Sequence, residues 1–172
     1  MKKKIILVGK AASGKDFFKN FLLEKGYKTS ISHTTRPMRD GETEGIEYFF
    51  VTEPAFSLAV TQNFFFEFKK FNGWHYGTSD FQMRESNVFI FTPEGVKDLP
   101  RIFKSQCTIV YFDIDENIRL ERLKKRSDSD TIERRLEADK EDFKDFKEYN
   151  IRIGGETFDC EYTLKKILSY EV

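Results

Sequence analysis

The stretch from Gly9 to Asp16 reads Gly-Lys-Ala-Ala-Ser-Gly-Lys-Asp and has the residue types and spacing of a phosphate-binding loop. Its glycines allow a tight turn whose backbone N–H groups converge on phosphate oxygens, and the positive end of the following helix points at them. The ammonium group of Lys15 would add a point charge at the β- and γ-phosphates of a nucleoside triphosphate. A chance glycine-rich turn is the alternative, but this loop lies between an apolar strand and an amphipathic helix. We therefore expect phosphate binding by Gly9, Lys10, Ala11, Ala12, Ser13, Gly14, Lys15 and Asp16.

Asp16 departs from the Ser or Thr that usually follows the lysine of such a loop. A hydroxyl at this position is a neutral Mg²⁺ ligand, whereas a carboxylate adds charge and could bind the ion directly or through water. Asp16 could also be a favourable acid in the first turn of a helix. One position can satisfy both interpretations, and Asp16 is our candidate Mg²⁺ ligand.

Two further segments strongly resemble the guanylate kinase family. The first reads Ser-His-Thr-Thr-Arg-Pro-Met-Arg-Asp-Gly-Glu over residues 32–42 and continues as Gly-Ile-Glu-Tyr-Phe-Phe-Val over residues 45–51. The second has Glu67 followed by Tyr-Gly-Thr at residues 76–78. With the phosphate loop and a charged segment at residues 115–149, the resemblance covers nearly the whole chain. It implies ATP as phosphoryl donor, Mg²⁺ as cofactor, and GMP or dGMP as acceptor.

The residues that the resemblance assigns to the acceptor suit a nucleoside monophosphate. Guanidinium forks and phenolic hydroxyls bind a dianionic phosphate, and Glu67 would accept hydrogen bonds from the N1–H and 2-amino groups of guanine. Adenine lacks that donor pair, so the carboxylate would discriminate between the two bases. Taken singly, each residue has a plainer interpretation as a loop charge, a packed ring or an exposed strand residue. The implied acceptor site comprises Ser32, Arg36, Arg39, Tyr48, Glu67, Tyr76, Thr78 and Thr92.

One segment departs from the family pattern, which has an Asp-x-Asp pair at the end of the next core strand. Here the chain reads Phe-Ile-Phe-Thr-Pro over residues 89–93, so Ile90 replaces the first acid and Thr92 the second. Thr92 keeps a hydroxyl that could hold the base. GMP, dGMP and a modified purine monophosphate therefore stay open as acceptors.

Residues 115–149 are rich in charge and favour helix, with a Ser-Asp-Ser-Asp turn at residues 127–130. The segment resembles the family's lid, in which arginines close over the transferring phosphates. We expect Arg126 and Arg135 to act there, although ion pairs on a solvated helix explain most of these charges. The catalytic set is then Lys15, Arg36, Arg126 and Arg135.

The surrounding elements suit an α/β protein. Apolar runs at residues 5–8, 87–91 and 107–112 predict buried parallel strands, each followed by a helical pattern. Over Lys15–Lys25, one helical stripe contains Phe17, Phe18, Phe21 and Leu22. Aromatic stretches at residues 46–52 and 63–78, with Asn72-Gly73 as a hairpin turn, predict a small antiparallel sheet.

The resemblance implies the P-loop nucleoside-monophosphate kinase fold, a parallel core sheet flanked by helices with a β-rich insertion and a helical lid. We expect a single domain of 172 residues. Its parts are a core of residues 1–31, 81–114 and 150–172, an acceptor-binding insertion of 32–80 and a lid of 115–149.

Composition narrows the remaining possibilities. Lys plus Arg equals Asp plus Glu at 29 each, so no overall basic field favours a nucleic-acid partner. Two cysteines and two histidines show no metal-site or disulfide spacing. The first apolar run is too short for a signal peptide or membrane span. We expect a cytoplasmic monomer or homodimer whose partners are small-molecule nucleotides, with neither nucleic acid nor membrane involved.

Two rival functions use the same features. The first is a guanylate-kinase-like module that has lost catalysis and docks peptides, which the missing Asp-x-Asp pair favours slightly. The retained Lys15 and loop glycines argue against it, because a docking module does not need them. The second is a kinase for another acceptor, such as a pyrimidine monophosphate or a nucleic-acid end, and Glu67 argues against pyrimidines.

Overall fold

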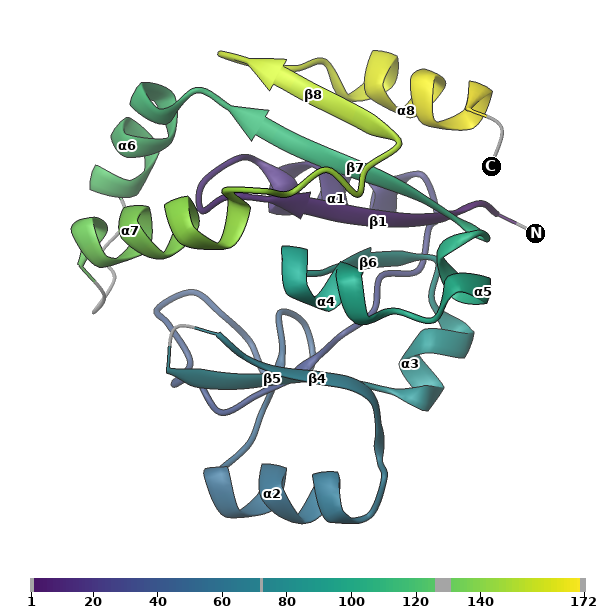
Figure 1. Cartoon of the computed structure of the whole chain (residues 1–172), viewed down its shortest axis with the longest axis vertical. Coiled ribbons are helices and arrows are strands. Elements are labelled where there is room, and N and C mark those ends of the chain that lie inside the picture. Colours follow the sequence, from purple (N-terminus) through teal and green to yellow (C-terminus); the bar gives the residue numbers. More distant parts are fainter. Residues whose placement is uncertain (1, 72, 126–130, 171–172) are drawn as a thin grey trace. The chain divides into compact units, whose positions relative to one another are not determined.

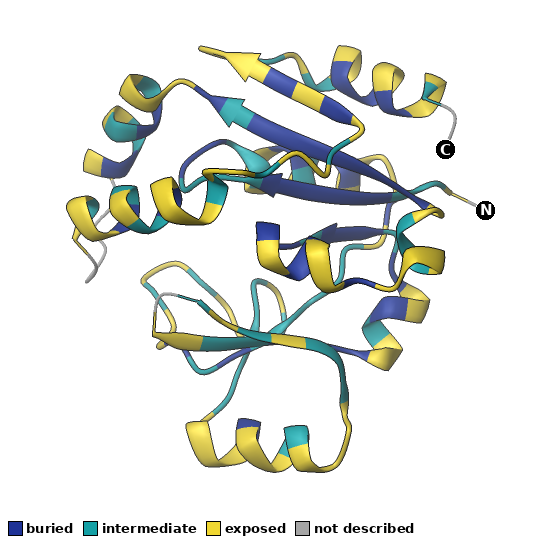
Figure 2. Ribbon diagram, in the orientation of Figure 1, coloured by how far each residue is buried: buried dark blue, intermediate teal, exposed yellow. Residues whose placement is uncertain are grey.

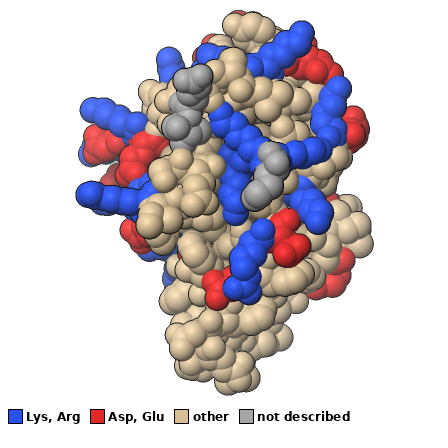
Figure 3. All heavy atoms as spheres, turned by 90° about the vertical axis from the view of Figure 1, so that its right-hand side faces the viewer, with Lys and Arg blue, Asp and Glu red and all other residues tan. Residues whose placement is uncertain are grey.

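The computed structural model describes residues 2–71, 73–125 and 131–170. The chain divides into two compact units, one formed by Met1–Thr29 with Asn87–Val172 and the other by Ser30–Ser86. We describe each unit by itself. Figure 3 shows one face of the molecule, on which Lys and Arg side chains occur together with Asp and Glu side chains.

The first unit is built on a parallel sheet of four strands in the order β6-β1-β7-β8. The strands are β1 (Lys4–Gly9), β6 (Val88–Ile90), β7 (Cys107–Ile114) and β8 (Ile151–Gly155). Ile5 to Val8 are fully buried because helices cover both faces of the strand, as the unbroken apolar run predicts. The predicted α/β class with a parallel core sheet is confirmed.

Helices cover both faces of this sheet (Figure 1). On one face, α1 (Lys15–Glu24) and α8 (Cys160–Ser169) contribute Phe18, Leu22, Leu164 and Ile167 to the main core. On the other face lie α4 (Pro93–Asp98), α5 (Arg101–Lys104) and α7 (Ile132–Phe143). There Phe103 packs edge-on against Phe89, and Tyr111 packs against the rings of Phe143, Phe146 and Tyr149.

The predicted stripe on α1 is wrong at one position. Phe18 and Leu22 are buried and Phe21 packs against the core, but Phe17 is 68% exposed. At about 100° per residue, Phe17 falls off the buried face of the helix. Figure 2 shows the alternation of buried and exposed positions on the helices.

The second unit holds a four-stranded sheet in the order β3-β2-β5-β4. Its strands are β2 (His33–Thr34), β3 (Phe49–Phe50), β4 (Phe65–Phe71) and β5 (Trp74–Ser79). The hairpin expected around Gly73 is present, because β4 pairs antiparallel with β5. The expectation for residues 46–52 is wrong, since only Phe49 and Phe50 form a strand there and it runs parallel to β2.

Two helices complete the second unit, α2 (Glu53–Thr61) and α3 (Asp80–Glu85). We did not predict α2. Its start is fixed by Thr52, whose side chain accepts a hydrogen bond from the Ala55 N–H, and by Pro54 in the first turn. Phe56 holds the helix against the sheet, because its ring stacks on Phe65 and on His75 with centroids 4.6 and 5.3 Å apart.

The region expected to form a lid holds α6 (Glu116–Lys124) and α7, which contact one another. Both helices belong to the first unit and bury charged side chains there. Arg119 is buried on α6, and Arg135 and Asp139 are buried on α7. None of the helices in the described part of the chain has the length and apolar composition of a membrane-spanning segment.

Candidate active site

The phosphate loop connects the end of β1 to the start of α1, as predicted. Gly14 has a φ of 91°, and a Cβ added to it would lie 2.9 Å from the Phe158 ring. Glycine is therefore required at this position on two grounds, backbone conformation and space. Lys15 folds back over the loop, and its Nζ donates hydrogen bonds to the carbonyls of Gly9 at 2.5 Å and Lys10 at 2.9 Å.

A cavity of about 400 Å³ opens beside the loop. A volume of this order suits a small-molecule ligand. Its walls combine backbone N–H groups, a lysine, an arginine and an aromatic ring, which are the groups that bind a nucleotide phosphate and pack against a base. The lining residues are Ala12, Ser13, Gly14, Lys15, Asp16, Phe17, Arg122, Thr157 and Phe158.

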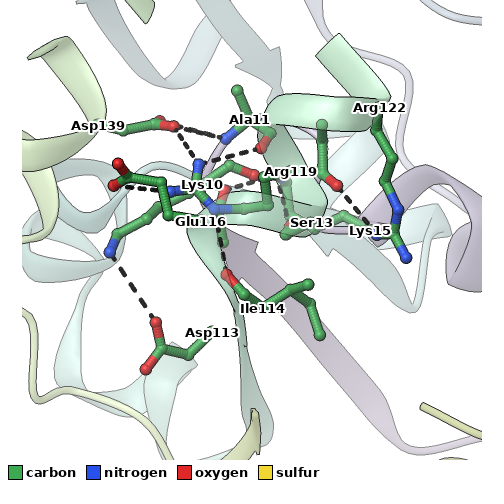
Figure 4. Close-up of polar contacts among 12 residues, drawn as sticks. Lys10, Ala11, Ser13, Lys15, Asp113, Ile114, Glu116, Arg119, Arg122 and Asp139 are labelled. Carbon is green, nitrogen blue, oxygen red and sulfur yellow. Dashed lines mark hydrogen bonds and ion pairs between the residues drawn. The ribbon is translucent and has the colours of Figure 1, made fainter. Parts of the chain in front are cut away.

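Three side chains from α6 and α7 bind the backbone of this loop (Figure 4). The Asp139 carboxylate accepts a hydrogen bond from the Ala11 N–H at 3.0 Å, and Arg119 donates to both Asp139 and the Ala11 carbonyl. Arg122 donates to the Ala12 carbonyl at 3.1 Å. Burial raises the pKa of Asp139, and the Ala11 N–H and the charge of Arg119 act in the opposite direction.

Asp16 lies in the first turn of α1, where it forms an i,i+3 ion pair with Lys19 at 3.7 Å. The carboxylate is exposed and belongs to the cavity wall beside Lys15. Ile90, the residue in place of the expected acid, ends β6 in register with Leu7 and packs against the hydrophobic core. The described residues contain no cluster of three or more His, Cys, Asp or Glu side chains that could hold a metal by themselves.

That donor set fits Mg²⁺ bound to a nucleotide. Mg²⁺ keeps several waters and is usually held by one or two carboxylates together with substrate phosphates, so a full protein cage is not needed. A single exposed carboxylate on the cavity wall, Asp16, would suit that role.

In the second unit, Arg36 is 7% exposed and is held on three sides. Its guanidinium forms a two-pronged ion pair with Glu42, at 2.7 and 3.0 Å, and donates to the Pro37 carbonyl. It also lies 5.3 Å from the Tyr48 ring centroid and 5.6 Å from that of Phe50. The Tyr48 ring in turn packs edge-on against Tyr76, so three of the predicted phosphate-binding residues are brought together.

Glu67, Thr78 and Ser32 form a second polar group in the same unit. Glu67 and Thr78 are paired across β4 and β5, and the hydroxyls of Ser32 and Thr78 lie 3.0 Å apart. Burial raises the pKa of Glu67, against hydrogen bonds from the Thr78 hydroxyl and backbone. A partly buried carboxylate next to a hydroxyl pair is suited to reading the donors of a base edge.

The remaining predicted residues are placed as follows. Arg39 donates its backbone N–H to Glu42 at 2.8 Å, close to Arg36. Thr92, in the first unit, caps α4, and its hydroxyl accepts from the Gly95 N–H at 3.0 Å. Arg135 is buried in α7. Arg126 lies outside the described residues.

Sequence reasoning missed five residues that the structure brings to the loop or its cavity. They are Arg119, Arg122, Asp139, Thr157 and Phe158. The available signal was weak, because charges at helical spacing in a highly charged segment look like a solvated face. Phe158, which packs against Phe18 and Phe112, looked like one more core ring.

Comparison with known proteins points to one family. A family model described as guanylate kinase matches residues 1–171. The guanylate kinase of Coxiella burnetii is 33% identical over 140 residues, which are 77% of this chain and 68% of that protein. A Helicobacter pylori guanylate kinase is 34% identical over 142 residues, 77% of this chain and 69% of that protein.

A solved structure shares the fold. The crystal structure of guanylate kinase from Anaplasma phagocytophilum matches with a TM-score of 0.71 at 23% identity, covering 96% of this chain and 82% of that chain. The phosphate loop, its cavity and the length of the family match lead to one conclusion: the chain belongs to the guanylate kinase family of ATP-dependent nucleoside-monophosphate kinases.

Proposed function

We propose that this protein transfers the γ-phosphoryl group of ATP to GMP or dGMP. The observation that carries the choice of base is the polar group around Glu67. Its carboxylate is partly buried, is hydrogen-bonded to Thr78, whose hydroxyl contacts that of Ser32, and matches the N1–H and 2-amino donors of guanine.

On the donor side, the loop amides and Lys15 bind the ATP phosphates. Lys15 must exchange its bonds to the Gly9 and Lys10 carbonyls for phosphate oxygens when ATP enters. Arg122, on the cavity wall, is placed to add charge there. Mg²⁺, held by Asp16 and the phosphates, would neutralise charge on the transferring group.

On the acceptor side, Arg36, Arg39, Tyr48 and Tyr76 bind the monophosphate. Arg36 is already oriented by Glu42 and by the rings of Tyr48 and Phe50, so little side-chain freedom is lost when a phosphate binds. The N–H groups that Glu42 and the Pro37 carbonyl leave over can then donate to phosphate oxygens. Tyr48 and Tyr76 supply hydroxyl donors from adjacent positions.

Phosphoryl transfer asks little covalent chemistry of the protein. The transition state spreads charge over the transferred group, and catalysis is mostly positioning and charge neutralisation. Lys15, Arg36 and Arg135 would supply that charge, together with Arg126. Donor and acceptor phosphates must meet, so we propose that residues 32–80 and 115–149 close on the substrates and exclude water.

A coupled ADP-release assay with ATP and Mg²⁺ across GMP, dGMP, AMP, UMP and dTMP tests the proposal. We expect turnover with GMP or dGMP to exceed the others by at least about 100-fold, because the other bases leave the Glu67 carboxylate unsatisfied. AMP or UMP turning over as fast as both guanine nucleotides would overturn the guanine assignment. A Glu85→Gln variant, altered at an exposed acid of α3, is the matched control for Glu67→Gln.

A further inference from the structure

The phosphate loop contains a backbone conformation that alanine disfavours. Ala12 has a φ of 58°, and among the described residues only Ala12 and Asn63 are non-glycine residues with a positive φ. A Cβ makes this left-handed region unfavourable, whereas glycine takes it readily. Contacts from outside the residue must therefore hold Ala12 in this conformation. Ala12 is 8% exposed and is one of the residues that line the cavity.

The groups that hold it come from α6 and α7. The Ala11 N–H donates to Asp139, the Ala11 carbonyl accepts from Arg119 at 3.3 Å, and the Ala12 carbonyl accepts from Arg122. Three polar groups of the Ala11–Ala12 backbone are thus bound by side chains more than 100 residues along the chain. The hydrogen bonds to the Ala11 and Ala12 carbonyls fix the two peptide planes on either side of the Ala12 Cα.

Arg119 and Asp139 are buried to an extent that charged side chains rarely reach. Their side chains are 2% and 6% exposed and form an ion pair at 2.9 Å. Burial of two charges is costly, and an apolar pair of similar volume serves a core as well or better. The pair is therefore poorly explained by the stability of α6 and α7 alone. Its remaining hydrogen bonds go to backbone, from Arg119 to the carbonyls of Ile114 and Ala11.

The location of Asp139 argues against direct competition with phosphate. The carboxylate accepts a hydrogen bond from the N–H of Ala11. Ala11 is not among the residues that line the described cavity. The lining begins at Ala12 and continues to Phe17. Asp139 thus binds the loop at a residue outside that lining, and the charge of Arg119 balances its own charge there (Figure 4).

We propose that Arg119 and Asp139 are positioning residues that hold the Ala11–Ala12 segment in the conformation that binds the donor phosphates. Neither residue touches the nucleotide. The proposal rests on the loop being the ATP site and not on the identity of the acceptor base. ATP binding is therefore its readout, separate from the guanine assignment.

The main test removes both charges together. In Arg119→Met/Asp139→Leu no buried charge is left unpaired, so the fold is expected to persist and thermal denaturation checks it. Without the hydrogen bonds of the pair, Ala12 can leave the left-handed region, and we expect ATP affinity by isothermal titration calorimetry to fall about tenfold. GMP affinity should change by less than about twofold, because most of the acceptor residues belong to the other unit and share no hydrogen bond with the pair. Lys104→Met/Glu148→Leu, which removes an ion pair that does not contact the loop, is the control.

A rescue separates positioning from general damage. Ala12→Gly introduced into the charge-free variant should recover part of the lost ATP affinity, because glycine adopts the positive φ without help. The same change is measured in the parent, and the difference is the coupling between position 12 and the pair. A merely structural role would give no such rescue.

Other outcomes overturn the proposal. A folded charge-free variant that binds ATP like the parent would show that the loop holds its shape alone. Tighter ATP binding in Asp139→Asn would show that the carboxylate competes with phosphate. If the charge-free variant does not fold, Arg119→Lys replaces it, since an ammonium keeps the charge but loses the guanidinium fork. Unchanged ATP affinity in that variant would count equally against the proposal, whereas a parent that fails to bind ATP would instead contradict the proposed function.

Discussion

The Arg36 guanidinium donates two hydrogen bonds to the Glu42 carboxylate, at 2.7 and 3.0 Å, and so a predicted phosphate ligand is already paired before substrate arrives. Burial alone would raise the pKa of Glu42, but its hydrogen bonds from Arg36 and from the Arg39 N–H, with the charges of both arginines, hold that pKa below the ordinary value of 4.5. Arg36 is therefore shared between structural pairing and substrate binding.

The first prediction concerns this pair and pH. Because the folded-state pKa of Glu42 is depressed, its stabilising effect is present above pH 4.5 and is lost as pH falls through the lower, folded value. Glu42→Gln should lower the free energy of unfolding by about 2 kcal/mol at pH 7, because it leaves Arg36 without its charge partner. Urea denaturation of both proteins at pH 7 and pH 3 measures this, and the difference between them should shrink at the lower pH.

The second prediction separates base recognition from stability at Glu67. Glu67→Gln should cost about 2 kcal/mol or more in kcat/KM for GMP, because an amide cannot accept from both guanine donors. The raised pKa of Glu67 means that its ionised form opposes folding once the pH rises through that pKa. The variant should therefore be at least as stable as the parent at pH 7. Unchanged GMP kinetics would remove Glu67 as the base reader.

The third prediction concerns Lys15. Lys15→Ala should abolish transfer, with a loss of at least about 100-fold in kcat, because its charge acts on the ATP phosphates. Lys15 donates hydrogen bonds to the Gly9 and Lys10 carbonyls and to the Ser13 hydroxyl, all within the loop, so circular dichroism of the variant should match the parent. Lys165→Ala, at an exposed position of α8, serves as the comparison. Parent-like turnover in Lys15→Ala would refute the donor-site assignment.

The fourth prediction concerns the metal. If Asp16 supplies the anionic ligand that Ile90 cannot, Asp16→Ser should raise the Mg²⁺ concentration for half-maximal activity about fivefold or more. Lys19→Met breaks the same ion pair while keeping the carboxylate, so it should not produce that shift. Equal Mg²⁺ titrations for Asp16→Ser and the parent would reduce Asp16 to a helix-start acid.

Adding Ile90→Asp to Asp16→Ser extends that test. Activity should recover in part, since a carboxylate returns to the metal site, and a double-mutant cycle measures the coupling. Ile90 packs against the core, so the added charge should also lower the melting temperature. A lower melting temperature with no recovery of activity would mean that the two positions do not share the ion.

The sequence was most informative where the determinants are local. A run of apolar residues, the glycine spacing and Lys15 are enough to predict a strand, a turn and a helix in that order. The Gly73 turn likewise specifies its hairpin. Residues 46–61 were harder, because many aromatic side chains favoured strands over the helix that Thr52 and Pro54 begin.

Long-range charge pairing could not be predicted in the same way. Arg119 and Asp139 come from different helices, and each looks solvated in a segment where charge dominates. Only the folded chain shows that both side chains bind the backbone of the same loop residue, Ala11. The sequence analysis singled out Arg126 and Arg135 and did not anticipate Arg122 on the cavity wall for the same reason, since neighbouring cations on a charged helix look alike in sequence.

The stack of Tyr111 on Phe143 gives α7 a pivot at its C-terminal end. At about 1.5 Å per residue, Asp139 lies about 6 Å from that pivot and Arg135 about 12 Å from it. Any swing of the helix about Phe143 therefore carries Arg135 twice as far as Asp139. A rotation of about 10° would move the arginine by about 2 Å but the aspartate by only about 1 Å, along an arm of this length. A small rotation of α7 would thus move Arg135 while leaving Asp139 close to the Ala11 N–H that it binds.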